Sequence, residues 1–210
     1  MLDTWFEWSM WLYAVVCVAT IVPLLFISAP YGRHQRAGWG PTMSARLGWI
    51  VMESPAVVAF GLFFFLGENS GDLVPLILLC VWQLHYIRRS FIYPFFLRID
   101  GKTMPVLIAA MAFVYNILNA FVNASWISTL GSYDTSWLAD PRFLVGAALF
   151  AFGMWLNISS DAILRALRAP GETGYKIPQR GLYRWVSSPN YLGEMVEWLG
   201  WAVMTWSISG

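Results

Sequence analysis

Six apolar runs limit the fold of this chain more than any other feature of its sequence. They lie at residues 8–28, 47–66, 73–96, 104–124, 143–164 and 190–208, and each is near the length that an α-helix needs to cross a bilayer. Hydrophobic residues make up 58% of the chain and charged residues only 12%, which excludes an ordinary soluble domain. Short linkers that contain Pro and Gly separate the runs. The sequence therefore predicts an all-α, polytopic membrane bundle of six transmembrane helices, forming one domain over residues 1–210.

The charges in the loops predict how this bundle is oriented. Of the 13 Lys and Arg residues, only Arg142 falls in an even-numbered loop. Positively charged loops stay on the cytoplasmic side of a membrane, so we expect the odd-numbered loops inside and the N-terminus outside. Asp3 and Glu7 precede the first run, where a cleavable signal peptide would carry basic residues. That run is therefore predicted to be a transmembrane helix.

Several common kinds of functional site lack support in the sequence. The chain has no basic tract interleaved with aromatic residues, which would indicate nucleic-acid binding. Cys17 and Cys80 lie inside apolar runs, where buried free thiols are expected rather than a disulfide or a metal site. HExxH, CxxC, GxSxG, Walker and GxGxxG motifs are missing. Metal-dependent hydrolysis, serine hydrolysis and a Rossmann nucleotide site are therefore unsupported, and no protein partner is evident.

Two polar features interrupt the second and third apolar runs. Glu53 lies inside the second run, where a carboxyl group is costly to bury and indicates either a functional proton or hydrogen-bond donor or a polar clamp between helices. His85 and Tyr86 lie near the end of the third run. A Tyr hydroxyl beside a buried carboxyl can polarise a ketone oxygen, although a Tyr at this depth is also typical of the interfacial aromatic belt.

The last two runs carry polar residues at helical spacing. Asn157, Asp161 and Arg168 are four and seven residues apart, so they follow one stripe of a helix that leaves the membrane. Amide, carboxylate and guanidinium groups together can bind a ribose, an amide and a phosphate; the alternative is an ordinary Asp–Arg pair at the surface. Asn190, Glu194 and Glu197 share one face of the last helix in the same way.

Nine separated stretches, in the same order, resemble the steroid 5α-reductase family across nearly the whole chain. They are APYGRH at 29–34, GWGP at 38–41, MESP at 52–55, HYIRRSFIY at 85–93, NISSDAILRALR at 157–168, GYKIP at 174–178, GLY at 181–183, VSSPNYLGE at 186–194 and EW at 197–198. The C-terminal stretches are the most specific. The stretches around Glu53 and Tyr86 are shorter but fall at the places where the family carries them.

The resemblance implies an enzyme that reduces the C4–C5 double bond of a 3-oxo-Δ4-steroid with NADPH, in contact with membrane lipid. Glu53 and Tyr86 would hold the 3-keto oxygen and stabilise the charge that builds there. Side chains from three parts of the chain would bind NADPH, with Lys176 standing where the family often has Arg. They are Asn157, Asp161, Arg168, Tyr175, Lys176, Asn190 and Glu194, with Tyr31, Arg89, Tyr93 and Arg98 as further contacts.

Other interpretations stay open at this point. A membrane methyltransferase of the isoprenylcysteine or phospholipid type has a similar polar C-terminal block and would bind S-adenosylmethionine. A non-catalytic sterol or lipid carrier would use the intramembrane carboxyls only as clamps. The resemblance also implies a seventh helix, which would follow Gly210. A multi-pass protein of this kind is expected in the inner membrane of a bacterium or the endoplasmic reticulum of a eukaryote, with its cofactor site on the cytoplasmic side.

Overall fold

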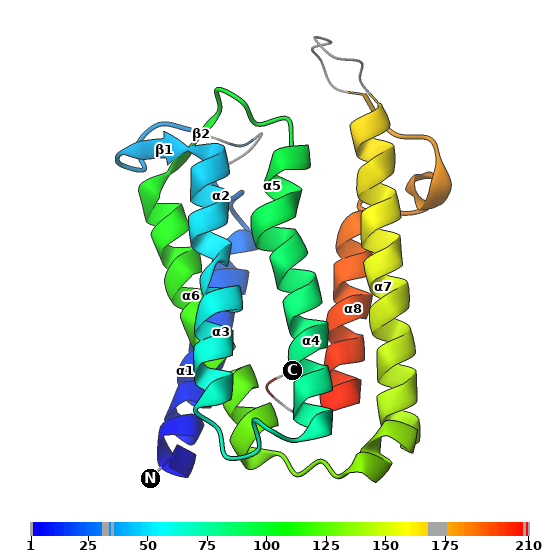
Figure 1. The fold of residues 1–210 in the computed structure, drawn as a ribbon. Helices are drawn as coiled ribbons and strands as arrows, with labels where there is room; N and C mark the ends of the chain where they lie inside the picture. Colours follow the sequence, from blue (N-terminus) through cyan, green and yellow to red (C-terminus); the bar gives the residue numbers. More distant parts are fainter. Residues whose placement is uncertain (1, 31–33, 35, 168–175, 208, 210) are drawn as a thin grey trace. The chain divides into compact units, whose positions relative to one another are not determined.

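The computed structural model describes the chain except residues 1, 31–33, 35, 168–175, 208 and 210, and it is mostly helical (Figure 1). The chain divides into two compact units. The first comprises residues 1–132 with Ser209, and the second comprises residues 133–208 with Gly210. The single domain expected from the sequence stays a prediction.

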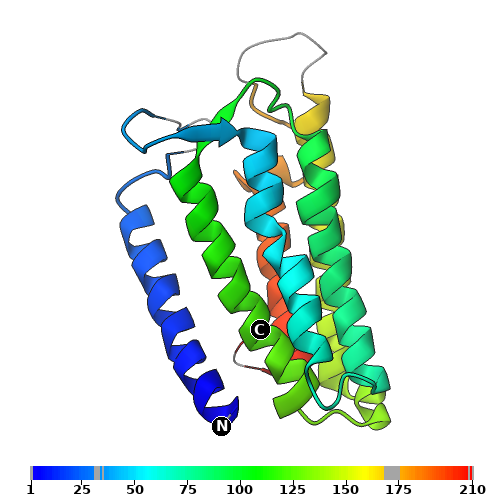
Figure 2. The same ribbon diagram turned by 60° about the vertical axis from the view of Figure 1, so that its left-hand side comes forward.

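The first unit is a set of helices with one short pair of strands. Its elements are α1 (Leu2–Leu24), β1 (Thr42–Ser44), α2 (Ala45–Glu53), α3 (Pro55–Phe65), α4 (Leu73–Ile87), the π-helical turn η2 (Arg88–Ile92), α5 (Tyr93–Phe96), β2 (Thr103–Pro105), α6 (Val106–Ser125) and the π-helical turn η3 (Trp126–Leu130). Helix α6 packs against α1, α2 and α3, and Figure 2 shows α1 running beside it. Helix α6 is thus the central element of this unit.

Length and apolar composition support membrane spans at four places in the described residues. These are Thr4–Leu24, Ala45–Phe65, Val106–Leu130 and Pro141–Ala166. The prediction of an all-α membrane protein is therefore confirmed, whereas the count of six spans stays a prediction. The run predicted at 73–96 consists of α4, η2 and α5 in succession. The last predicted run corresponds to α8 (Pro189–Thr205), which has 17 residues.

The second apolar run lies within one candidate span, Ala45–Phe65, whose helix is interrupted at Ser54 between α2 and α3. Pro55 has no N–H, so it cannot donate to the carbonyl of Val51 four residues earlier. The Ser54 hydroxyl donates to that carbonyl instead, at 2.9 Å. Glu53 is the last residue of α2, directly before this interruption.

Neighbouring elements satisfy the other carbonyls at this break. Asn116 of α6 donates its amide N–H to the Met52 carbonyl at 2.8 Å, and the Ser90 hydroxyl of η2 donates to the Glu53 carbonyl at 3.1 Å. A helix interruption at membrane depth is tolerated only when protein groups satisfy the backbone groups that it frees. These two bonds anchor the backbone of Glu53 to two different elements.

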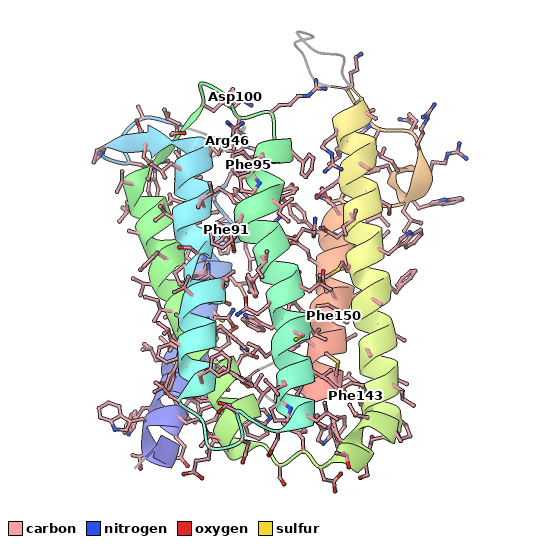
Figure 3. All side chains as sticks on the ribbon, in the orientation of Figure 1. Arg46, Phe91, Phe95, Asp100, Phe143 and Phe150 are labelled. Atoms are coloured by element: carbon pink, nitrogen blue, oxygen red, sulfur yellow. The ribbon has the colours of Figure 1, made fainter. Side chains whose placement is uncertain are left out.

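One end of the first unit is held by strand pairing and by charge. Strands β1 and β2 pair antiparallel, with Met43 opposite Met104. Arg46 contacts Asp100 at 2.8 Å and donates to the Pro94 carbonyl at 3.3 Å, and its guanidinium lies 5.5 Å from the centre of the Phe95 ring. Figure 3 labels Arg46, Phe95 and Asp100 at this end. The first and third loops of the chain, both basic, therefore meet at one end of the unit.

The second unit is an antiparallel helix pair with two short 3-10 segments. Its elements are η4 (Thr135–Ala139), α7 (Pro141–Ala166), η5 (Gly181–Arg184) and α8 (Pro189–Thr205). Asp140 caps α7 and Pro141 begins it, while Pro189 begins α8. Glycines on both helices lie where a side chain would meet the backbone of the other helix. Helices α7 and α8 therefore pack backbone to backbone, as small residues allow in membranes.

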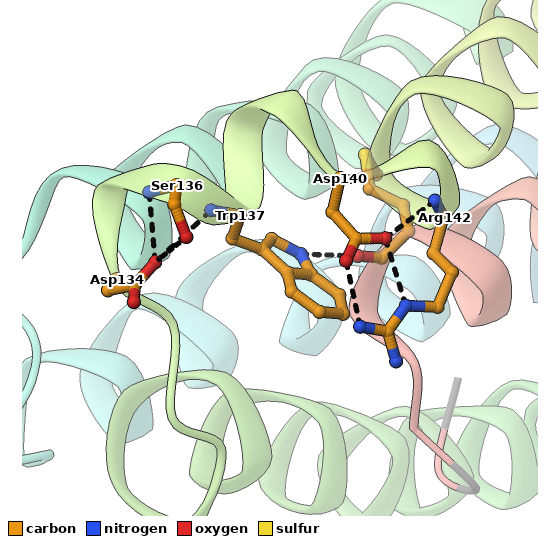
Figure 4. A network of polar contacts seen from close by, with 6 residues as sticks. Asp134, Ser136, Trp137, Asp140 and Arg142 are labelled. Atoms are coloured by element: carbon orange, nitrogen blue, oxygen red, sulfur yellow. Dashed lines mark hydrogen bonds and ion pairs between the residues drawn. The ribbon is translucent and has the colours of Figure 1, made fainter.

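A polar network joins the start of α7 to the end of α8 (Figure 4). Two nitrogens of Arg142 donate to the two carboxylate oxygens of Asp140, at 2.9 and 2.8 Å. The Arg142 guanidinium also lies between the rings of Trp137 and Trp206, 4.4 and 5.1 Å from their centres. Trp137 donates its ring N–H to the carbonyl of Met204 at 3.1 Å. The hydrogen bonds from the Arg142 side chain and backbone N–H lower the pKa of Asp140 from 3.8 to about 2.

The expectation of buried cysteines is wrong for Cys80, which is exposed on α4, while Cys17 on α1 is half-buried. The physical reason is that an apolar run in a membrane bundle is apolar on its outer face as well as its inner face. Apolar surroundings in the sequence therefore do not locate a thiol. Helix α1 also begins earlier than the predicted run and includes Glu7.

Candidate functional site

In the first unit, two hydrogen bonds hold the backbone around Glu53 against the segment that carries Tyr86. The Ser90 hydroxyl donates to the Glu53 carbonyl at 3.1 Å, and the Trp82 ring N–H donates to the Ala56 carbonyl at 2.7 Å. Glu53 ends α2 at the helix break and is half-buried. Tyr86 lies in the last turn of α4, and only 7% of it is exposed. Its ring packs against Trp82 at 4.7 Å between ring centres. The burial of Tyr86 contradicts the alternative of an interfacial belt residue.

Tyr86 belongs to a polar cluster, buried at Asn119 and Asn123 and half-buried at Tyr13 and Tyr115, that the sequence did not predict. Asn119 donates its amide N–H to the Tyr86 hydroxyl oxygen at 3.2 Å, and the Tyr13 hydroxyl donates to the Asn119 side-chain oxygen at 3.2 Å. Asn123 donates to the same oxygen at 3.1 Å, and the Tyr115 hydroxyl lies 3.0 Å from that of Tyr13. A signal was present, because Asn116, Asn119 and Asn123 recur at helical spacing inside an apolar run.

Arg89 and Tyr93, two of the predicted cofactor contacts, lie together at η2 and α5. The Arg89 guanidinium is 4.8 Å from the centre of the Trp49 ring and 4.9 Å from that of Tyr93. Trp49 also donates its ring N–H to the Arg89 carbonyl at 3.2 Å. The guanidinium of Arg89, a residue of the π-helical turn η2, therefore lies over two aromatic rings, which fixes the position of its positive charge.

In the second unit, the structure brings four predicted residues of α7 and α8 into one hydrogen-bonded cluster. Asn157 donates to the Asn190 carbonyl at 3.1 Å and to a Glu194 carboxylate oxygen at 3.3 Å. Asn190 in turn donates to a carboxylate oxygen of Asp161 at 3.3 Å. Asn157 and Asp161 are only 1% and 3% exposed. Asp161 is therefore not a surface residue but faces α8. Arg168, its partner in the alternative of a surface pair, lies outside the described residues.

Glu197 is fully buried. It lies on the same stripe of α8 as Gly193 and Gly200, and this stripe packs against α7. The cluster of Asn157, Asp161, Asn190 and Glu194 offers amide donors and carboxylate acceptors within one helix pair. Ribose hydroxyls and a carboxamide present the complementary donors and acceptors. The donor set therefore fits the polar parts of a dinucleotide.

The remaining predicted contacts have different environments. Arg98 is exposed after α5, and Lys176 is exposed in the segment that follows α7. Tyr31, Arg168 and Tyr175 lie outside the described residues. The roles assigned to all of these residues stay predictions.

The family model described as 3-oxo-5-alpha-steroid 4-dehydrogenase matches residues 102–210 of the chain. These residues include α6, α7 and α8, and thus the cluster at Asn157 and the Asn119 amide. Glu53 and Tyr86 precede the matched residues.

Individual relatives match the first half as well. The chain is 40% identical to a steroid 5-alpha-reductase of Gossypium hirsutum, over 99% of this chain and 82% of the relative. It is 42% identical to 3-oxo-5-alpha-steroid 4-dehydrogenase 1 of Bos taurus, over 93% of this chain and 76% of the relative. The human protein of the same name is 42% identical over 86% of this chain and 70% of the relative.

Proposed function

This chain belongs to the 3-oxo-5-alpha-steroid 4-dehydrogenase family, whose members are oxidoreductases, and from that premise we propose that it reduces the C4–C5 double bond of a 3-oxo-Δ4-steroid with NADPH. The observation that supports this most is the buried Tyr86, whose hydroxyl oxygen accepts a hydrogen bond from Asn119. The Glu53 backbone lies against the same segment of the chain, because its carbonyl accepts a hydrogen bond from Ser90. An apolar bundle needs no such arrangement to fold. It suits a reaction that builds negative charge on a ketone oxygen.

NADPH, when bound, supplies a hydride to C5 of the enone. The cluster of Asn157, Asp161, Asn190 and Glu194 would hold its ribose and carboxamide groups, for which the donors and acceptors of the cluster are suited. Arg and Lys side chains suit its phosphates, because guanidinium binds two oxygens and ammonium acts as a point charge. We assign that role to Arg89, Arg98, Arg168 and Lys176, with Tyr31, Tyr93 and Tyr175 as neighbouring contacts.

Tyr86 and Glu53 would act on the substrate. The Tyr86 hydroxyl donates a hydrogen bond to the 3-keto oxygen, and the protonated Glu53 carboxyl supports this polarisation as a second donor. As the hydride reaches C5, the electron pair of the C4–C5 bond moves toward C3 and places charge on the oxygen that these two groups hold. A proton from the solvent then adds to C4, which converts the enolate to the saturated ketone product.

The same proposal assigns the cofactor to the cytoplasmic side of the membrane. Arg46, Arg98 and Lys102 lie in the odd-numbered loops, which the positive-inside rule places in the cytoplasm. NADPH is a water-soluble polyanion and must reach the protein from the aqueous phase. The flat apolar steroid is suited to enter from the membrane.

A ligand-stabilisation experiment tests this function against a methyltransferase. A ligand that binds only the folded state raises apparent stability, by about 2.7 kcal/mol at a hundredfold excess over its Kd. NADPH should therefore raise the melting temperature of the purified protein, and S-adenosylmethionine should leave it unchanged. A Glu194→Gln variant should need a higher NADPH concentration for the same rise. Stabilisation by S-adenosylmethionine alone would contradict the proposed function.

A further inference from the structure

A chain of hydrogen bonds, half-buried at Tyr13 and Tyr115 and buried at Asn119, runs through the first unit and ends at Tyr86. It links Tyr115 and Asn119 of α6 to Tyr13 of α1 and to Tyr86 of α4. Asn119 is 7% exposed, and the rings of Tyr13 and Tyr115 stack with their centres 5.6 Å apart. None of these bonds is needed to pair the helix backbones, so the arrangement calls for an explanation in terms of what Tyr86 does.

The direction of the chain at Asn119 is fixed by Asn123. Asn123 donates one amide N–H to the Asn119 backbone carbonyl at 3.1 Å. A carbonyl only accepts hydrogen bonds, so this contact determines which end of the Asn123 amide is the NH2 group. The same NH2 group contacts the Asn119 side chain at 3.1 Å, and Asn119 must therefore turn its oxygen toward Asn123. The Asn119 NH2 group then faces Tyr86.

The tyrosines continue the same direction. Tyr13 has one hydroxyl hydrogen, and it donates this hydrogen to the Asn119 side-chain oxygen. Between the two stacked tyrosines, Tyr115 must then be the donor and Tyr13 the acceptor. Every donor thus points along the chain from Tyr115 through Tyr13 and Asn119 to the hydroxyl oxygen of Tyr86.

We propose that Asn119 is a positioning residue that directs the Tyr86 hydroxyl hydrogen toward the ketone oxygen of the substrate. Because Asn119 presents an N–H, the Tyr86 hydrogen cannot be donated to it and is directed to a different acceptor. Accepting a hydrogen bond also makes a hydroxyl a stronger donor, and aligned chains reinforce this effect. The inference rests on the proposed function, since it needs a ketone that Tyr86 activates.

The test measures both turnover and the hydrogen bond to the bound enone. Asn119→Leu removes the N–H at similar volume, and kcat should fall by about tenfold, the equivalent of one hydrogen bond. The Kd for NADPH should stay the same. In the unreactive complex with NADP⁺, the ultraviolet absorption band of the enone moves to longer wavelength when its carbonyl accepts a strong hydrogen bond. This displacement should be smaller in Asn119→Leu than in the wild type.

Tyr13→Phe provides a second variant, in case Asn119→Leu does not fold. It keeps Asn119 in place but removes one hydrogen bond of the chain, and kcat should fall by about twofold. The displacement of the enone band to longer wavelength should be slightly smaller than in the wild type. Ser128→Ala is the matched control, because Ser128 is a buried polar residue whose hydroxyl donates within its own helical segment, to Ala124 at 2.8 Å. It should leave kcat and the band unchanged.

The outcomes separate this inference from the function on which it rests. A wild-type protein that neither displaces the enone band nor oxidises NADPH would refute the proposed function and the inference together. If the wild type is active and Asn119→Leu has the same kcat and the same enone band, the inference alone is refuted. Where Asn119→Leu does not fold, the same result in Tyr13→Phe refutes it. If Asn119→Leu lowers the melting temperature but leaves kcat per NADPH-binding site unchanged, Asn119 has a purely structural role and the inference is refuted.

Discussion

A Tyr86→Phe variant should lose about a hundredfold to a thousandfold in kcat, the usual effect of removing one donor to a developing oxyanion. The substitution deletes only the hydroxyl of a side chain that is 7% exposed and packed against Trp82. The ring packing should therefore survive, and the Kd for NADPH should stay within a factor of about two of the wild type. Steady-state kinetics and a cofactor titration on the same preparation measure the two quantities.

Glu53→Gln is the companion variant. The amide has nearly the volume of the carboxyl but is a weaker partner for a ketone or a phenol, so kcat should fall with the cofactor Kd again unchanged. Tyr133→Phe is the matched control, because the Tyr133 hydroxyl also donates a hydrogen bond, to the Thr205 carbonyl at 2.6 Å. It should lower the melting temperature slightly and leave kcat intact. Full turnover in Tyr86→Phe or Glu53→Gln would remove the proposed role of that residue.

The largest effect on stability is expected from Gly153→Ala. A Cβ atom at this position of α7 would lie 2.6 Å from the Gly193 carbonyl oxygen of α8, closer than real side chains come. Backbone atoms cannot rotate away, so the helices must separate at a cost of about 1–3 kcal/mol. Asn157 lies one turn farther along α7, so its bond to Glu194 should weaken and the Kd for NADPH should rise.

The control for this prediction is Gly71→Ala. A Cβ atom at Gly71 would meet no atom within 4 Å, and the melting temperature should change little, because such a surface substitution stays within about 0.5 kcal/mol. Thermal unfolding followed by circular dichroism compares the two variants. Equal melting temperatures for Gly153→Ala and the wild type would show that α7 and α8 do not pack through this glycine.

Features set by local patterns could be predicted from the sequence. The long apolar runs predicted α1, α6 and α7 because burial in lipid leaves few alternatives to a helix. Helical spacing also grouped Asn157 with Asp161 and Asn190 with Glu194, and the structure joins these four side chains across α7 and α8. Spacing identifies a common face but not the partner helix.

Features that depend on distant residues could not be predicted. Pro55 alone did not predict the interruption of the second span. The interruption also depends on Asn116 and Ser90, which donate hydrogen bonds to the carbonyls there and come from distant parts of the sequence. The strand pair is three residues long on each side, too short for a periodic pattern. The orientation of Asn119 depends on Asn123, Tyr13 and Tyr86 together, which lie on three helices.

The most direct measurement follows the hydride itself. The purified protein is given a 3-oxo-Δ4-steroid and NADPH that carries deuterium at C4 of the nicotinamide, with each of the two stereoisomers tested separately. With one isomer, mass spectrometry and NMR should find a single deuterium at C5 of a saturated 3-ketone, and solvent hydrogen at C4. A product without deuterium at C5 from either isomer, or no product while S-adenosylmethionine is consumed, would contradict a reductase in which Tyr86 and Glu53 activate the enone.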